Sequence, residues 1–186
     1  MKAYIIKIEL LDSYPLIWRR VVMPADAMFR RLHDVIQTVT NFLSGGPYGG
    51  YHLYEFDLST ENTSVTNDEE SFEEYQYYKQ NKKQYEERLR LAPIGSFQRS
   101  SLERLMKTVV RQPSRIKIDK YLEKYKEIRY SYDFGDGWEF LITLEQIVDD
   151  YHFGYPTLLA GAESAPPEDV GGMGGFEEIL KNYRDT

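Results

Sequence analysis

The stretch Tyr130-Ser131-Tyr132-Asp133-Phe134-Gly135-Asp136-Gly137-Trp138-Glu139-Phe140 alternates apolar and polar side chains on both sides of a glycine-rich turn. Apolar residues take every second position from Ile128 to Phe134 before the turn, and again from Trp138 to Leu144 after it. A period of two is typical of strands with one buried face. The stretch therefore predicts an antiparallel β-hairpin whose aromatic face belongs to the protein core.

The turn predicts how the two strands pair. A two-residue turn at 136–137 would send the two apolar rows to different faces of the sheet. We therefore expect a three-residue loop, in which Gly137 adopts the left-handed conformation and Phe134 faces Trp138. The further expected pairs are Tyr132 with Phe140, Tyr130 with Ile142 and Ile128 with Leu144.

The same register places Asp133 directly opposite Glu139 on the polar face of the hairpin. Two carboxylates at opposed positions repel each other. We expect such a pair to need a cation, a proton or an arginine between the side chains. The polar face of the hairpin is therefore where we look for a functional site, whereas the turn itself is expected to be structural.

The rest of the chain predicts one α+β domain. Residues 2–11 and 17–23 suggest an opening hairpin, and a helix from Met28 to Asn41 carries an apolar stripe at helical spacing. We expect a mainly antiparallel twisted sheet with one core helix packed on a face, plus a helical insertion and a short C-terminal helix. A length of 186 residues suits a single domain, 1–186, with residues 59–115 inserted into it.

Local signals add detail to this outline. Residues 45–50, which are glycine-rich, predict a loop. Within the insertion, the capping box Ser71-Phe72-Glu73-Glu74 predicts a helix that continues until Pro93 forbids it. The capping box Ser100-Ser101-Leu102-Glu103 predicts a second helix.

Composition restricts the class of protein. The chain has no cysteine, which excludes a disulfide framework, a thiolate zinc site and a cysteine nucleophile. Any metal site must therefore use histidine and carboxylate ligands. Because no apolar run approaches the length of a membrane span and the N-terminal residues alternate like a strand, we expect a cytoplasmic protein that does not contact a membrane.

Charge is unevenly distributed along the chain. The net charge is −7, yet residues 99–127 hold nine basic and four acidic residues. Such a basic segment would bind phosphates in a salt-dependent way if it faced nucleic acid. Since its basic residues are dispersed, a solvated surface beside acidic segments is the simpler interpretation.

Five short segments carry a more specific signal: Ile17-Trp18-Arg19-Arg20, Leu32-His33-Asp34-Val35-Ile36-Gln37, His52-Leu53, Tyr132-Asp133-Phe134-Gly135-Asp136-Gly137-Trp138 and Pro166-Pro167-Glu168-Asp169-Val170-Gly171-Gly172. Together and in this order they resemble the plasmid pRiA4b ORF-3-like family. The resemblance leaves residues 59–115 unmatched. It implies an α+β fold and an association with plasmids and other mobile elements, but no established activity. Where family members commonly carry a cysteine this chain has Ala165, so no thiolate site is expected.

Polar residues of these segments form the candidate site. We expect them to build a polar cleft, with Trp18 and Trp138 as aromatic support and no assigned catalytic residue. The cleft candidates are Arg19, Arg20, His33, His52, Asp133, Asp136, Glu139, Glu168 and Asp169. A divalent metal is the only cofactor considered, and its candidate ligands are His33, His52, Asp133 and Glu139. For Glu168 and Asp169, capping or pairing with arginine is the simpler role, next to glycines that allow the backbone to approach another strand closely.

Three functions compete. The arginines could neutralise the carboxylates in a binding or scaffolding module, which we favour. Alternatively, His33 or His52 with the hairpin acids could hold a divalent metal that activates water to hydrolyse a phosphodiester. The third function is association with nucleic acid as an accessory protein of a mobile element. Because no nucleophile–base pair or phosphate loop is present, we expect no enzyme, and a protein partner or small ligand rather than nucleic acid.

Overall fold

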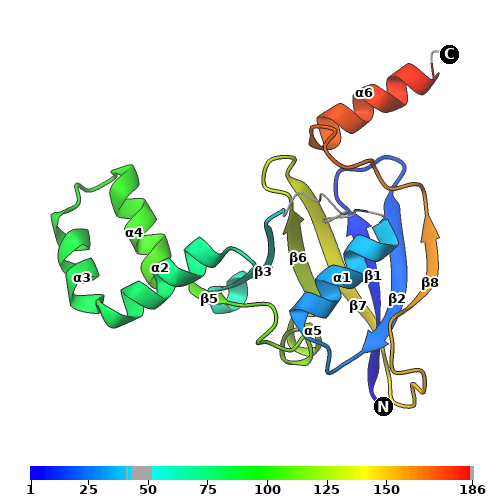
Figure 1. The fold of residues 1–186 in the computed structure, drawn as a ribbon, viewed down its shortest axis with the longest axis horizontal. Helices are drawn as coiled ribbons and strands as arrows, with labels where there is room; N and C mark the ends of the chain where they lie inside the picture. The colour runs from blue at the N-terminus through cyan, green and yellow to red at the C-terminus, as the bar shows by residue number, and fades with distance from the viewer. Residues whose placement is uncertain (41, 43–51, 185–186) are drawn as a thin grey trace.

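The computed structural model describes residues 1–40, 42 and 52–184, so the loop expected at 45–50 lies outside the described residues. Figure 1 shows one large sheet with a helix lying across one face. The strands are β1 (Ala3–Leu10), β2 (Ile17–Pro24), β3 (Tyr54–Leu58), β4 (Thr63–Thr66), β5 (Val109–Arg111), β6 (Glu127–Tyr132), β7 (Trp138–Val148) and β8 (Thr157–Ala162). The helices are α1 (Phe29–Thr40), α2 (Glu69–Gln80), α3 (Lys82–Leu91), α4 (Phe97–Lys107), α5 (Asp119–Tyr125) and α6 (Gly172–Arg184), with a 3-10 turn at Ser59–Glu61.

The eight strands form one sheet in the order β5-β4-β3-β6-β7-β1-β2-β8. Neighbouring strands are antiparallel, except that β4 and β5 are parallel. This arrangement confirms the predicted α+β class and its mainly antiparallel sheet. The assignment of 59–115 as an insertion into a single domain stays a prediction.

The core lies between α1 and the face of the sheet that α1 covers. Alternate residues of the strands point to this face because successive side chains of a strand point to opposite sides. They meet the apolar stripe of α1, which includes Phe29, Leu32 and Ile36, all fully buried. The predicted aromatic face of the hairpin is part of this core: Tyr130, Tyr132, Trp138 and Phe140 are each at most 1% exposed.

The predicted register of the hairpin is wrong by two residues. Tyr132 faces Trp138, so residues 133–137 form a five-residue connection and Phe134 is 50% exposed. The cause lies in the turn, where Gly137 N–H donates to the Asp133 carbonyl oxygen over 2.6 Å and closes the hairpin earlier. A shift of two residues keeps each side chain on its face, which is why the aromatic face was still predicted correctly.

The register also corrects the expected carboxylate pair. Ser131 lies opposite Glu139, and Asp133 lies in the turn with a φ of 52°. The two carboxylates therefore do not face each other across the strands. Asp133 tolerates the left-handed conformation because its short side chain bonds locally: Oδ1 accepts from the N–H of Gly135 over 3.1 Å.

The helices of residues 59–115 extend away from the sheet in Figure 1. The helices α2 and α4 begin a few residues earlier than the capping boxes predict. Asp68 caps α2 and Ser96 caps α4, and each side chain accepts a hydrogen bond from the backbone N–H of the third residue after it. The single helix expected up to Pro93 is interrupted at Asn81, between α2 and α3. Tyr85, Ala92 and Leu102 form a small apolar cluster of their own there. Across the described ranges, no helix combines the length and apolar character that crossing a bilayer requires.

Candidate functional site

His33 lies on α1 and is buried against the aromatic residues of the sheet. Its ring stacks on Tyr54 with 3.7 Å between the ring centroids and 7° between the planes. Its Nδ1 lies 2.7 Å from the hydroxyl oxygen of Tyr130, which also accepts a hydrogen bond of 3.3 Å from Gln37 Nε2. We assign the hydroxyl proton to the bond with Nδ1, because Nδ1 is the acceptor that lies against it.

This bonding fixes the protonation of the His33 ring. Burial and the nearby Arg30 guanidinium lower the pKa of His33 to about 4, so the imidazole is neutral at pH 7. With Nδ1 accepting, the ring proton is on Nε2. Within the described ranges, Nε2 has no partner and is not among the buried unpaired atoms. It is therefore a neutral hydrogen-bond donor that can reach a ligand.

His52 lies just before β3 and is held there by the corner between β4 and α2. The Asn67 side chain donates from Nδ2 to the His52 carbonyl over 3.0 Å and accepts from the N–H of Tyr54 over 2.8 Å. Thr66 Oγ1 donates to the Tyr54 carbonyl over 2.7 Å. These bonds fix the backbone at the start of β3, and the His52 ring contacts Tyr132 edge-on at 5.6 Å.

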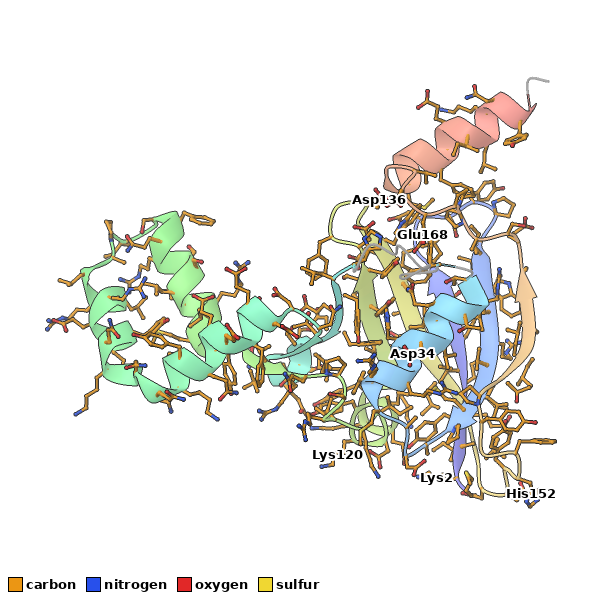
Figure 2. All side chains as sticks on the ribbon, viewed as in Figure 1. Lys2, Asp34, Lys120, Asp136, His152 and Glu168 are labelled. Atoms are coloured by element: carbon orange, nitrogen blue, oxygen red, sulfur yellow. The ribbon has the colours of Figure 1, made fainter. Side chains whose placement is uncertain are left out.

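A cleft of about 290 Å³ lies between α1, β3 and the base of the inserted helices, and both histidines line it. Charged groups of both signs surround it, with Arg30 and Asp34 on α1 opposite Glu69 on α2. Figure 2 shows Asp34 on α1 at this side of the molecule. The lining residues are Arg30, His33, Asp34, His52, Tyr54, Thr66, Asn67, Asp68, Glu69, Phe72, Gln112, Pro113 and Ser114.

His52 also joins two carboxylates beside the cleft. Its Nδ1 lies 3.4 Å from Asp133 Oδ2, and its Nε2 lies 3.8 Å from Asp169 Oδ1. The Asp133 side chain is 14% exposed, whereas that of Asp169 is 78% exposed. The hairpin turn, the start of β3 and the loop before α6 thus meet at one imidazole.

The loop before α6 packs directly on the hairpin turn, as Figure 2 shows for Glu168 and Asp136. Tyr132 donates its hydroxyl proton to Glu168 Oε1 over 2.6 Å, and the N–H of Gly171 donates to Asp136 Oδ2 over 3.3 Å. Gly172, with a φ of +67°, leaves no room for a Cβ atom against the Asp136 carbonyl. The expected close backbone approach is therefore made to the turn, not to a strand. Among the described residues, Glu168 pairs with a tyrosine rather than with the expected arginine.

The two arginines are not part of this cleft. Arg19 bonds three backbone carbonyls, from Nε to Val39 and from Nη1 to Trp18 and Ala162, over 2.8–2.9 Å. Arg20 points to the opposite face of the sheet, where it forms a two-bond ion pair with Glu145. Alternation along β2 predicts these opposite directions, but it does not reveal that Arg19 serves backbone carbonyls.

Glu139 and the two tryptophans also lie apart from the cleft. Glu139 is on the face opposite Trp138 and Phe140, so the expected metal set loses this ligand. Trp138 is fully buried in the core against Phe42, and its Nε1 has no partner among the described residues. Trp18 lies on the outer face, where Arg20 is 5.1 Å from its ring centroid.

Sequence reasoning missed the cleft residues Arg30, Asp34 and Asn67. Arg30 and Asp34 lie one turn apart on the exposed side of a helix whose prediction rested only on its apolar stripe. Their spacing around His33 is the signal that could have identified them. Asn67 belongs to the segment that no motif covers, and only the fold brings it to His52.

Comparison with known proteins places the chain in a family. A family model described as plasmid pRiA4b ORF-3-like protein matches residues 2–186. The chain belongs to the plasmid pRiA4b ORF-3-like family. The uncharacterised protein y4hQ of Sinorhizobium fredii is 27% identical over 180 residues, which cover 97% of this chain and 72% of that protein. A crystal structure of a protein of unknown function, MM3350 from Methanosarcina mazei Go1, is 27% identical with a TM-score of 0.67, over 100% of this chain and 83% of the other.

Proposed function

We propose that this member of the plasmid pRiA4b ORF-3-like family is a binding module whose cleft takes a small ligand carrying both an anionic and a cationic group. One observation carries the proposal: charged groups of both signs, the positive Arg30 and the negative Asp34 and Glu69, line one cleft together with the buried ring of His33. Such a set of convergent polar groups in a concave site is typical of small-molecule binding.

The chemistry of the ligand follows from the groups that are free to bind it. Arg30 and the His33 Nε2–H are donors suited to a carboxylate. Asp34 and Glu69 line the same cleft and suit an ammonium group. Asp68 is not available, because its carboxylate accepts from the N–H of Ser71 at the start of α2.

The volume of the cleft narrows the class of ligand further. A cleft of about 290 Å³ is just below the range of small-molecule pockets, which starts at ~300 Å³. An α-amino acid carries a carboxylate and an ammonium group at this scale. The proposed ligand is therefore a small amino-acid-like zwitterion, bound by Arg30, His33 and the acidic residues.

The test is isothermal titration of the full chain with the common α-amino acids at pH 7. For each amino acid that binds, the amine lacking the carboxylate and the acid lacking the amine serve as matched probes. We expect saturable binding of at least one amino acid, weakened at least about tenfold when either group is removed. Binding of none of the amino acids would overturn the proposal.

Variants of α1 assign the binding to this cleft. Arg30→Gln removes the guanidinium of an exposed side chain, so it should fold normally and weaken binding at least about tenfold. Arg31→Gln changes the neighbouring exposed arginine, which does not line this cleft, and should leave the affinity unchanged. Equal effects of the two substitutions would show that the ligand binds elsewhere.

Ion pairs in the basic segment favour a small ligand over nucleic acid. Arg99 bonds Glu103 over 3.1 Å, and Lys124 bonds Glu61 over 2.8 Å. Part of the positive charge of the basic segment is therefore already paired with acidic side chains. The segment is also divided between α4, β5 and α5 rather than gathered on one helix. Salt-dependent binding to mixed oligonucleotides would reverse this preference.

A further inference from the structure

We infer that His52, Asp133 and Asp169 form a binding site for a divalent transition-metal ion. One ligand atom of each residue lies within 4.8 Å of the others, so the three side chains form one compact group in which two can bind an ion and the third can support a ligand. Within the part of the chain that the structure describes, this is the only group of three such side chains. The inference does not depend on an amino-acid ligand in the neighbouring cleft.

The geometry assigns a role to each residue. His52 Nε2 and Asp169 Oδ1 lie 3.8 Å apart, against about 3.4 Å for two ligands at ~2.1 Å from a tetrahedral ion. Because the Asp169 side chain is 78% exposed, a small rotation closes this difference. These two atoms coordinate the ion directly.

Asp133 positions the imidazole. Its Oδ1 accepts from the N–H of Gly135 over 3.1 Å, which turns Oδ2 toward His52 Nδ1 at 3.4 Å. A carboxylate that accepts from the second nitrogen of a metal-bound histidine fixes the ring and makes it a stronger ligand. The hairpin turn therefore places a carboxylate beside His52 Nδ1, while Asp169 lies beside Nε2.

The negative charge of the two carboxylates is an independent reason to expect a bound cation. Two carboxylates flank one imidazole, and no described lysine or arginine forms an ion pair with either of them. A bound divalent cation would balance both negative charges, as it does at other carboxylate sites. Without it, the half-buried Asp133 carboxylate has backbone N–H groups of the turn and the His52 imidazole beside it, but no described lysine or arginine.

The donor set indicates the kind of ion. A nitrogen and oxygen ligands without thiolate suit Zn²⁺, Mn²⁺ and related ions rather than soft Cu(I). Few protein ligands leave coordination positions open for water or a ligand, as in catalytic sites. Since His52 also lines the cleft, these open positions adjoin the cleft.

The test is isothermal titration of the full chain, stripped of metal with a chelator, with ZnCl₂ and with MnCl₂ at pH 7. We expect one saturable site for at least one of the two ions. His52→Asn and Asp169→Asn should abolish the site. Asp133→Asn, which keeps an oxygen for the turn, should weaken affinity by about 10–100-fold.

Two variants serve as matched controls. His152→Asn changes an exposed histidine at the far end of the molecule, as Figure 2 shows, and Glu139→Gln changes a carboxylate on the opposite face of the sheet. Both should keep the wild-type affinity within about twofold, because surface changes away from a site have small effects. Circular dichroism of each variant checks that the fold is intact.

The outcomes separate this inference from the proposed function. Absence of saturable binding for both ions, or equal affinities for wild type, His52→Asn and Asp169→Asn, overturns the metal site. Arg30→Gln should bind metal normally, while Asp169→Asn should bind the amino acid normally. A failed metal titration therefore leaves the cleft proposal standing, and a failed amino-acid titration leaves the metal site standing.

Discussion

The buried His33 should make the stability of the protein depend on pH in the mildly acidic range. The pKa of His33 is about 4 in the folded protein and near the ordinary value of 6.5 in the unfolded chain. Between these values the unfolded state binds a proton that the folded state does not. Folding free energy is therefore lost as the pH falls from about 6.5 toward about 4, and none is lost by this route at higher pH.

The difference between the two pKa values sets the magnitude. The full loss is about 3 kcal/mol, of which about 2 kcal/mol falls between pH 7 and pH 5. Carboxylates in ion pairs have lowered pKa values, among them Glu61, Glu123 and Glu145, and their contribution is lost at still lower pH. The interval from pH 7 to pH 5 therefore isolates His33 best.

Urea unfolding at pH 7, 6 and 5 measures this dependence. We expect His33→Asn, which keeps an acceptor near the position of Nδ1, to be less stable than wild type at pH 7 and to lose about 2 kcal/mol less between pH 7 and pH 5. The variant of the exposed His152, His152→Asn, should keep the wild-type slope. Parallel pH dependence in wild type and His33→Asn would refute the assignment of a neutral, buried imidazole.

Further substitutions test the packing around the site. Arg19→Ala should lower the free energy of unfolding by about 2–4 kcal/mol, because three hydrogen bonds from a half-buried guanidinium to backbone carbonyls are lost. Arg20→Ala removes a surface ion pair and should lower the free energy of unfolding by less than about 1 kcal/mol. Chemical denaturation distinguishes the two variants. Gly172→Ala should destabilise the protein by more than about 1 kcal/mol, because the new Cβ would meet the hairpin turn. Gly174→Ala should stabilise it by about 0.5–1 kcal/mol, because a Cβ there meets nothing and alanine favours the helix. The melting temperature should therefore fall for the first variant and rise for the second. Phe134→Ser should lower the free energy of unfolding by no more than about 1 kcal/mol, since half of the ring is already exposed. A loss of about 2–3 kcal/mol would restore the register expected from the sequence.

The fold could be predicted because its signals are local. Alternation in the hairpin and the helical stripe of α1 each specify which face is buried, and these faces meet in the core. The hairpin register could not be predicted from alternation alone, because a shift of two residues preserves it. The closing bond from Gly137 to the Asp133 carbonyl decided the register, and it depends on turn geometry that several loop lengths permit.

The candidate site was predicted only in part because it forms between distant segments. His52, Asp133 and Asp169 were all candidates, yet their contact depends on how the loop before α6 packs on the hairpin turn. Arg20 and Glu139 could be excluded from the site only once the structure showed which face of the sheet each side chain occupies. Asn67 carried no motif, and its bond to the His52 carbonyl is visible only in the folded chain.

The histidines provide the most direct test of the central claim that His33 and His52 share one ligand-binding cleft. The chain has three histidines, so imidazole resonances in a two-dimensional nuclear magnetic resonance spectrum can be assigned with one Asn variant each. During titration with an α-amino acid that binds, we expect the resonances of His33 and His52 to shift together while those of His152 stay unchanged. Shifts at His152 alone, or saturable binding with no shift at His33, would contradict the account.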